Sequence, residues 1–261
     1  MVYEEQNPPD GQGAIVACYW RFIVEAGDAV PFEHTIMPDG TVSLVYYEGA
    51  STHHWGVRFT GPGVAARKIM ISAPGRWLGI RFRAGVVAAV LGINAGGLRD
   101  RTETLDSQSA LAVCMRSALR SATSIEESVE RLATCVNRWI AASRPLDTVV
   151  VAAAAAIAAA GGRIRISGLG AASGLSVRQL RRRFVQEVGL TLKEYARARR
   201  VRRVCVDALG DIKSRWADIS SAAGYADQAH LSRDFRGVFR MSPQAIDAFV
   251  RSIRHQRIVD R

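Results

Sequence analysis

Side chains suited to reading nucleic-acid bases gather in two short stretches near the C-terminal end of this sequence. The first stretch carries Arg178, Arg181 and Arg182, and a guanidinium group can donate two hydrogen bonds to O6 and N7 of guanine in the major groove. The second carries Gln228, which can pair with adenine, and Ala229, which can pack on the methyl group of thymine. These two stretches therefore predict base-specific contacts.

Other polar side chains in the same region are candidates for weaker or sequence-independent contacts. Arginine occupies positions 181–183, and three consecutive side chains of a helix cannot all face the bases, so at least one must act through its charge. His230 is compatible with a base contact, a phosphate contact or simple exposure. The further expected base contacts are His230, Ser232 and Arg233, and the expected phosphate contacts are Arg183, Lys193 and Arg236.

Each stretch lies on an amphipathic helix that follows a glycine. Gly174 and Gly224 can adopt the positive φ that a tight turn between two helices requires, and Ser176 can cap the helix after the first turn. Apolar residues recur at helical spacing on one face of each helix, and they are Val177, Leu180, Phe184 and Val188 in the first and Leu231, Phe235, Val238 and Phe239 in the second. The pattern predicts two helix-turn-helix units whose polar faces point outward.

A basic helix over residues 192–209 is expected to connect the two units. At the usual rise per residue this helix would span about 27 Å. Successive major-groove faces of B-DNA lie about 34 Å apart. One helix and its two turns can therefore hold both outward faces over neighbouring grooves of one duplex.

Several spaced elements of this region resemble the DNA-binding domain of the AraC/XylS family of bacterial transcription regulators. They are Gly174-Leu-Ser, the Leu180/Phe184 pair, Tyr195 ahead of an arginine-rich helix, Gly224-Tyr225, the run from Asp227 to Ser232, Phe235, Phe239 and Pro243. The resemblance implies a sequence-specific regulator of transcription that binds double-stranded operator DNA. The further candidate partners are a small-molecule effector, RNA polymerase and a second copy of the chain.

The charge distribution agrees with a polyanionic partner for the C-terminal part alone. The formal net charge is +11, and residues 163–261 hold 21 Lys/Arg against 9 Asp/Glu, whereas residues 1–162 hold 14 against 15. Clustered cations gain affinity for nucleic acid because they release condensed counterions from the phosphate backbone. Charge alone would also fit a solvated basic face, so the helical pattern decides between the two interpretations.

The N-terminal part reads as short strands separated by turns. Runs rich in β-branched and aromatic residues occupy residues 15–24, 42–47, 55–59, 68–71 and 77–83. Pro38-Asp39-Gly40 and Gly61-Pro62-Gly63 are the clearest turns between them. The region resembles a sensor-like domain of unassigned ligand that precedes AraC-type domains, through Tyr19-Trp20, Met37 to Val45 and the run from Leu78 to Gly92.

The aromatic residues of these strands could line a ligand pocket or form ordinary core. They are Trp20, Phe22, Tyr46, Tyr47, Trp55, Trp77 and Phe82. The sequence does not distinguish the two uses, because residues of a strand alternate between its faces. The ligand-binding residues are therefore unknown at this stage.

Helices are expected after the strands. A short helix is predicted at residues 85–91 and a longer one at residues 108–122. Ser124 and Glu127 form a capping box ahead of a further helix. The apolar stripe of that helix from Ile125 to Trp139 could dock on the β-domain or form a dimer interface. Ser143-Arg-Pro-Leu-Asp147 marks a linker, and an alanine-rich packing helix is expected at residues 148–160.

These observations predict an α+β chain of two domains. Residues 1–144 form a small β-barrel or sandwich with trailing helices, and residues 145–261 form an all-α double helix-turn-helix domain. Residues 1–144 would serve as a sensor or dimerisation domain. The expected protein is cytoplasmic and does not span a membrane, because its one apolar run, residues 149–160, is shorter than the ~20 residues that a bilayer requires.

Two other classes of function remain as alternatives. One is a ligand-independent architectural DNA binder, and the other is an enzyme or a metal-binding cupin-like domain fused to a DNA-binding tail. His34, His53 and His54 could be imagined as metal ligands, but ligand spacing is missing, and the four cysteines are far apart and expected to be reduced. We therefore expect no catalytic residue, no metal and no cofactor.

Overall fold

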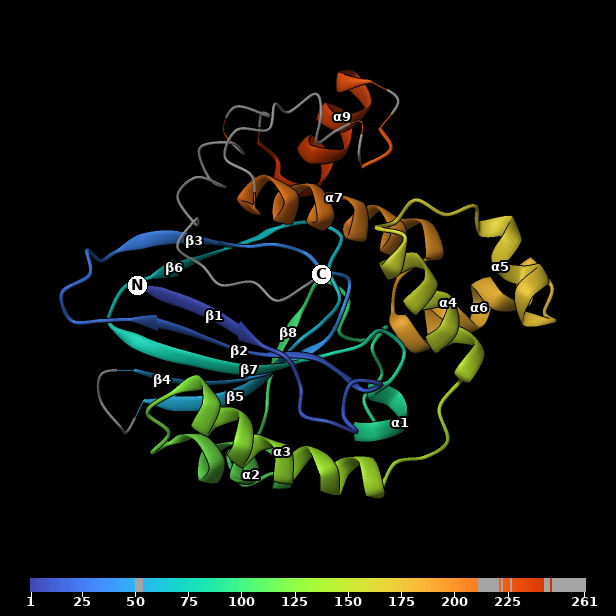
Figure 1. The fold of residues 1–261 in the computed structure, drawn as a ribbon. Coiled ribbons are helices and arrows are strands. Elements are labelled where there is room, and N and C mark those ends of the chain that lie inside the picture. The colour runs from blue at the N-terminus through green and yellow to red at the C-terminus, as the bar shows by residue number, and fades with distance from the viewer. Residues whose placement is uncertain (50–53, 211–220, 222, 226, 242–244, 246–261) are drawn as a thin grey trace.

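The structure is a computed structural model of the 261-residue chain. It describes residues 1–49, 54–210, 221, 223–225, 227–241 and 245, and within these the side chains of residues 171–173, 208–210 and 228 are not described (Figure 1). The first part of the chain is β-rich and the second part is helical. This arrangement confirms the expected α+β class, with a sandwich of two sheets in place of a closed barrel.

The described residues of the β-rich part form eight strands. They are β1 (Val2–Gln6), β2 (Val16–Val24), β3 (Phe32–Ile36), β4 (Ser43–Gly49), β5 (Trp55–Thr60), β6 (Arg67–Ile71), β7 (Gly75–Phe82) and β8 (Thr102–Thr104). Five of them match the predicted runs within one or two residues at most ends. The strands β1, β3 and β8 were not predicted, because they are short or rich in charged residues and only pairing with a neighbour makes them strands.

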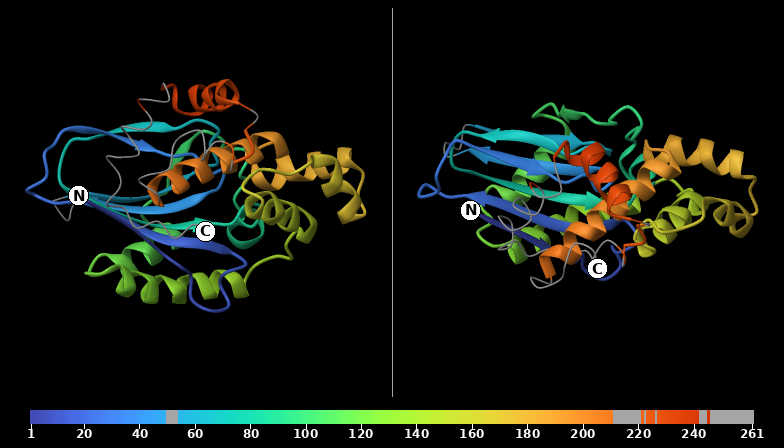
Figure 2. Two further views of the ribbon diagram at one scale, coloured as in Figure 1. Left: turned by 45° about the horizontal axis from the view of Figure 1, so that its top comes forward. Right: turned by 90° about the horizontal axis from the view of Figure 1, so that it is seen from above.

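The strands are arranged in two layers. The larger sheet has the order β1-β2-β7-β4-β5-β8, and β3 pairs with β6 in a separate two-stranded sheet (Figure 1). All of these pairings are antiparallel. The sheet of β3 and β6 lies over one face of the large sheet (Figure 1 and Figure 2). One face of the large sheet is therefore left for helices and the other for the β3–β6 layer.

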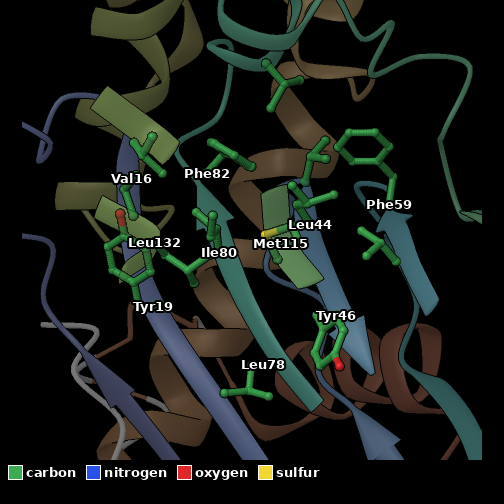
Figure 3. Close-up of a cluster of buried hydrophobic side chains, with 14 of the residues drawn as sticks. Val16, Tyr19, Leu44, Tyr46, Phe59, Leu78, Ile80, Phe82, Met115 and Leu132 are labelled. Atoms are coloured by element: carbon green, nitrogen blue, oxygen red, sulfur yellow. The ribbon is translucent and has the colours of Figure 1, made fainter. Parts of the chain in front are cut away.

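The helix-facing side of the large sheet holds the main hydrophobic core. Alternate strand residues such as Tyr19, Leu44, Ile80 and Phe82 are fully or almost fully buried there (Figure 3). They pack against α2 (Ala110–Leu119) and α3 (Ile125–Ala141), and the short helix α1 (Val87–Leu91) completes this side. Burial of the apolar stripe of α3 in this core shows that the stripe docks on the chain's own β-domain.

Two of the cysteines correct the sequence-based expectation. Cys114 of α2 and Cys135 of α3 form a disulfide, whereas Cys18 and Cys205 are free and buried. The expectation of four reduced thiols is wrong for the first pair. The 21-residue separation hid the pairing, because only the packing of α2 against α3 brings the two sulfurs together.

The helical part contains two further cores. It comprises α4 (Thr148–Ala159), α5 (Ile166–Ser173), α6 (Val177–Val188), α7 (Leu192–Gly210) and α9 (Gln228–Phe239). The alanine-rich helix α4 is capped by Asp147 and buries Val150 and Ile157 against α6, which is the packing role predicted for it. Helix α3 ends at Ala141 and α4 begins at Thr148, so the expected linker lies between two helices. No helix among the described residues is long and apolar enough to cross a bilayer.

Candidate nucleic-acid interface

The first helix-turn-helix unit consists of α5 and α6. Gly174 ends α5 with a φ of 64°, which a residue with a side chain adopts rarely. Ser176 then caps α6 and completes a capping box with Gln179. A Cβ atom at Gly170 would lie 2.9 Å from Cγ2 of Val177, so the two helices cross closely. The local sequence thus fixes both the turn and the start of the outward helix.

Helix α6 buries one face and presents arginines on the other. Leu180, Phe184 and Val188 are at most 2% exposed, as their spacing predicts. Arg178, Arg181 and Arg182 are exposed, and no ion pair engages them within the described part of the chain. Helix α6 follows a glycine turn and carries three exposed guanidinium groups, so it has the chemistry needed to read guanines in a major groove.

Arg183 differs from its neighbours. Its Nε donates to Oδ2 of Asp147, the capping residue of α4, over 2.6 Å. The carboxylate hydrogen bond raises the pKa of the Arg183 guanidinium, and Asp147 has a lowered pKa because the hydrogen bonds from Arg183 and from the Val150 amide outweigh its burial. In this structure Arg183 therefore ties α6 to α4. Phosphate contacts from Arg183 and from the exposed Lys193 stay predictions.

The second unit is described from Ser221 onward, and the first helix predicted for it, from Trp216, lies outside the described residues apart from a few positions. Gly224 has a φ of 76°, in agreement with the predicted turn. Asp227 caps α9 by accepting from the amide of His230. Leu231, Phe235, Val238 and Phe239 are at most 2% exposed and form the predicted buried stripe.

The outward face of α9 is less basic than that of α6. Ala229, Arg233 and Arg236 are exposed, and Ser232 is half-buried. His230 packs edge-on against the ring of Tyr225 at 5.1 Å, so part of its surface is used inside the domain. The side chain of Gln228 lies outside the described ones, although its backbone begins α9. The roles of these residues on DNA stay predictions.

Comparison with known proteins supports this geometry. Residues 169–248 match a family model described as a helix-turn-helix domain, of the AraC type. The C-terminal part of the chain is an AraC-type DNA-binding domain. Residues 5–104 match a separate family described as a domain of unknown function (DUF6597). The protein is therefore a DNA-binding transcription regulator with an additional N-terminal domain.

Solved structures of ToxT from Vibrio cholerae align with most of this chain at very low identity. An apo ToxT variant shares 8% identity at a TM-score of 0.47, covering 89% of this chain and 97% of that one. Another ToxT structure shares 9% identity at a TM-score of 0.45, covering 89% of this chain and 96% of that one. ToxT with a bound unsaturated fatty acid shares 8% identity at a TM-score of 0.46, covering 87% of this chain and 94% of that one. No curated protein matches the chain significantly.

The connector α7 of the AraC-type domain uses its arginines internally. Arg197 forms an ion pair with Asp234 of α9 at 3.0 Å, and Arg203 pairs with Asp207 at 2.8 Å. Arg200 donates to the carbonyl of Gly162 and lies over the ring of Tyr225 at 5.5 Å. Arg197 and Arg200 therefore hold α7 against neighbouring parts of the domain, whereas the Arg203 pair lies within α7 itself; charge counting does not reveal these uses.

Arg202 of α7 joins the two domains through a buried charge cluster that the sequence did not reveal. Its Nη2 lies 3.5 Å from Oε1 of Glu5 on β1, and Glu5 also accepts from Arg81 of β7 at 2.7 Å. Arg81 pairs in addition with Asp39 at 2.6 Å. Burial alone would raise the pKa of Glu5, but Arg81 and Arg202 outweigh it, so its pKa is lowered. The cluster balances two carboxylates against two guanidinium groups.

Further contacts hold the AraC-type domain against the N-terminal domain. Arg99 pairs with Glu194 of α7 at 2.6 Å. A Cβ atom at Gly189, the residue that ends α6, would lie 2.6 Å from the carbonyl oxygen of Ala95. The amide of Ala66 donates to the carbonyl of Val238 on α9 over 2.6 Å. Both helix-turn-helix units are thus in contact with loops of the N-terminal domain.

A cavity lies between the large sheet and the β3–β6 layer. It has a volume of about 830 Å³, including its solvent-filled mouth. Trp20, Phe22 and Trp77 line this cavity, as a ligand pocket would require. Tyr46 and Phe82 instead belong to the helix-side core, and Trp55 packs there beneath Arg116. The predicted aromatic set therefore divides between the two uses that the sequence left open.

The histidines considered as metal ligands have other surroundings. His34 stacks on Phe22 with ring centroids 4.5 Å apart, and burial lowers its pKa to about 4. His54 is exposed beside Tyr47, and His53 lies outside the described residues. Among the residues that the structure describes, no group of three His, Cys, Asp or Glu side chains could hold a metal ion.

Proposed function

We propose that this regulator recognises an operator by placing α6 and α9 in neighbouring major grooves of one duplex. The observation that carries the proposal is the exposed arginine face of α6, which follows a capped glycine turn within an AraC-type domain. The 19-residue helix α7 joins the two units and spans about 28 Å at the usual rise, close to the separation of successive grooves. The ion pair of Arg197 with Asp234 joins α9 to this connector.

We also propose that the N-terminal domain makes DNA binding responsive to a small molecule. Support comes from the cavity behind the β3–β6 layer and from the direct contacts between cavity-side loops and both helix-turn-helix units. A ligand that alters these contacts changes the relative placement of α6 and α9, and by linkage operator DNA alters ligand affinity by the same factor. The proposal requires no catalytic residue, metal or cofactor.

Selection of bound fragments from random double-stranded DNA tests the first proposal. We expect enrichment of one motif with two conserved blocks whose centres lie about one helical turn, roughly 10 base pairs, apart. The variant Arg182→Ala should relax preference within one block, whereas Arg203→Ala, which removes an ion pair of α7 away from both helix faces, should leave the motif unchanged. Absence of any preferred motif at moderate salt would refute sequence-specific binding.

A second copy of the chain and RNA polymerase remain predicted partners. The apolar stripe of α3 cannot supply the dimer contact, because it is buried against the large sheet. Sedimentation of the protein alone and with a selected operator measures whether one or two copies bind.

A further inference from the structure

The walls of the cavity follow directly from strand alternation. Residues of β2, β4, β5 and β7 that point away from the helix-side core point toward the β3–β6 layer, because successive side chains lie on opposite faces. Trp20 and Phe22 of β2, Trp77 of β7 and Val45 of β4 supply one wall. The opposite wall comes from the small sheet, with His34 and Ile36 of β3 and Ile69 of β6. Aromatic and aliphatic side chains therefore line both walls, which meet where Phe22 stacks on His34.

Most polar groups at the edge of this cavity have partners. Arg81 pairs with Glu5 and Asp39, and Asp39 also accepts from the hydroxyl and amide of Thr41. Arg67 donates to the carbonyl of Arg101 and to the hydroxyl of Thr102. These contacts engage donors of both arginines, and the charge of Arg81 is balanced by carboxylates, whereas both partners of Arg67 are neutral.

Arg58 of β5 is different. Its side chain lines the cavity, and its Nε is buried without an acceptor among the described residues. Its guanidinium lies 5.1 Å from the centre of the Tyr47 ring, and its pKa is lowered by burial with no carboxylate to oppose that effect. Arg58 is half-buried, and a partly desolvated cation without a counterion costs folding free energy that an anionic ligand would offset.

The indole N–H of Trp20 is a second buried donor without an acceptor in the described part of the chain. Trp20 lies flat against Gly79 of β7, where a Cβ atom would approach its ring to 2.5 Å, and it stacks on Tyr3. The ring is therefore fixed in place by its surroundings. Two arginines of the cavity, Arg58 and Arg67, form no ion pair among the described residues, and one neutral donor is spare beside them. Together with the apolar lining, these groups favour a ligand that brings acceptor oxygens and negative charge.

We propose that this cavity binds a small organic acid with a flat apolar body, whose acid group pairs with Arg58. The proposal names the ligand class for the effector response proposed above, and it depends on that response only for its regulatory consequence. An acid group gives the Arg58 guanidinium the counterion that the protein does not provide, and the apolar body packs between Trp20 and Trp77 on one side and Ile69 on the other. Neutral ligands of the same shape lack the first contribution.

The loops that close the cavity are the ones that contact the DNA-binding domain. The turn at residues 37–41 supplies Met37, Pro38, Asp39 and Thr41 to the cavity. A Cβ atom at Gly40 of this turn would lie 2.6 Å from the ring of Tyr195 on α7. Tyr195 in turn packs on Phe184 of α6 with ring centroids 5.7 Å apart. Movement of this turn on ligand binding therefore reaches the buried face of the first recognition helix.

The loop between β5 and β6 makes the matching contact with the second unit. Gly61, Gly63 and Ala65 line the cavity, and the adjacent Ala66 donates its amide to Val238 near the end of α9. Met37 and Ala66 both pack on the core of the second unit. One ligand can thus bias the position of both units, because both rest on loops that form its site.

Calorimetric titration of the full chain without DNA tests the site. The probes are cinnamate and indole-3-acetate, each compared with its uncharged amide. We expect at least one acid to bind more than about tenfold tighter than its amide, and Arg58→Met to remove that difference. The control Arg120→Met changes an exposed arginine at the end of α2, beyond the other face of the sheet, and should leave it intact. Equal binding of acid and amide, an unchanged preference in Arg58→Met, or no binding of either acid at about 1 mM would overturn the proposal.

A second measurement does not depend on the chosen probes. Arg58→Met should raise the melting temperature of the ligand-free protein by about 2–4 °C, because it removes a half-buried cation that has no counterion among the described residues. A lower melting temperature would mean that the protein itself satisfies Arg58, and it would contradict the proposed role. If an acid binds through Arg58 but leaves operator affinity unchanged, the site stands and the proposed effector response fails.

Discussion

The buried charge cluster between β1, β7 and α7 makes a quantitative prediction for Glu5→Gln. In the structure Glu5 accepts from the Tyr3 hydroxyl and from Arg81, both at 2.7 Å, and lies 3.5 Å from Arg202. Its residue surface is only 8% exposed, so solvent screens these interactions weakly. The glutamine keeps the shape and one acceptor, but it withdraws the negative charge that faces two buried guanidinium groups.

Breaking one partner of a buried ion pair typically costs 3–5 kcal/mol. Because glutamine retains some hydrogen bonding, we expect a loss of about 3 kcal/mol in the free energy of unfolding at pH 7. For a chain of this size that loss lowers the melting temperature by roughly 6–12 °C. The pKa of Glu5 is lowered in the folded state, so this stabilisation is complete at pH 7 and is lost only as the pH falls below the ordinary glutamate range.

Thermal unfolding followed by circular dichroism measures the effect. The matched control is Glu33→Gln, which removes the same charge from an exposed ion pair with Lys68. The side chains of Lys68 and Glu33 are 46% and 48% accessible, so this change should alter stability by less than about 1 kcal/mol. A double-mutant cycle with Arg202→Met isolates the contact between the domains, since Arg202 lies on α7 and Glu5 on β1. Equal melting temperatures for Glu5→Gln and Glu33→Gln, or strict additivity in the cycle, would refute the reasoning.

Three further predictions concern other parts of the chain. Replacing Arg182 by alanine should cost about 1–3 kcal/mol of operator binding and relax preference at one base pair, whereas uniform weakening on all sequences with a smaller salt slope would reassign this residue to phosphate. The disulfide between Cys114 and Cys135 closes a loop over a separation of 21 residues, so its reduction should lower the free energy of unfolding by about 3 kcal/mol. Cys135→Ser should abolish this response to reductant. Mass spectrometry that finds four free thiols in the unreduced protein would contradict the prediction. Burial lowers the pKa of His34 to about 4, so the unfolded chain binds more protons than the folded chain between that pH and the ordinary histidine range. Between pH 7 and pH 5 the wild type should therefore lose about 1–2 kcal/mol more of its free energy of unfolding than His34→Gln does. Parallel melting curves at the two pH values would reveal or exclude this difference.

Local signals sufficed for the helix-turn-helix units. Gly174 and Gly224 do adopt positive φ, Ser176 and Asp227 do cap the following helices, and the apolar stripes of α6 and α9 are buried. Each of these features depends on residues within a few positions of one another, which is why spacing could predict them. The connector helix was predicted within one residue of its described end for the same reason.

Features that depend on residues far apart in the chain were missed. The strands β1, β3 and β8 form through pairing with partners elsewhere, and β1 carries two glutamates that gave no strand signal. The disulfide, the ion pair of Arg183 with Asp147 and the use of the α7 arginines within the protein belong to the same class. Charge counting could not separate an arginine that faces solvent from one that faces a carboxylate.

By itself the sequence determined the glycine turns, the caps and which faces of α6 and α9 are buried, because helical period, turns and caps are local properties of the chain. Only the tertiary structure decided what lies behind that segment. Strand alternation by itself does not say which face of a sheet meets helices, so the cavity, the uncompensated Arg58 and the division of the aromatic residues appear only once both layers are placed. The pairing of Glu5 with Arg202, 197 positions away, likewise exists only because folding brings β1 beneath α7.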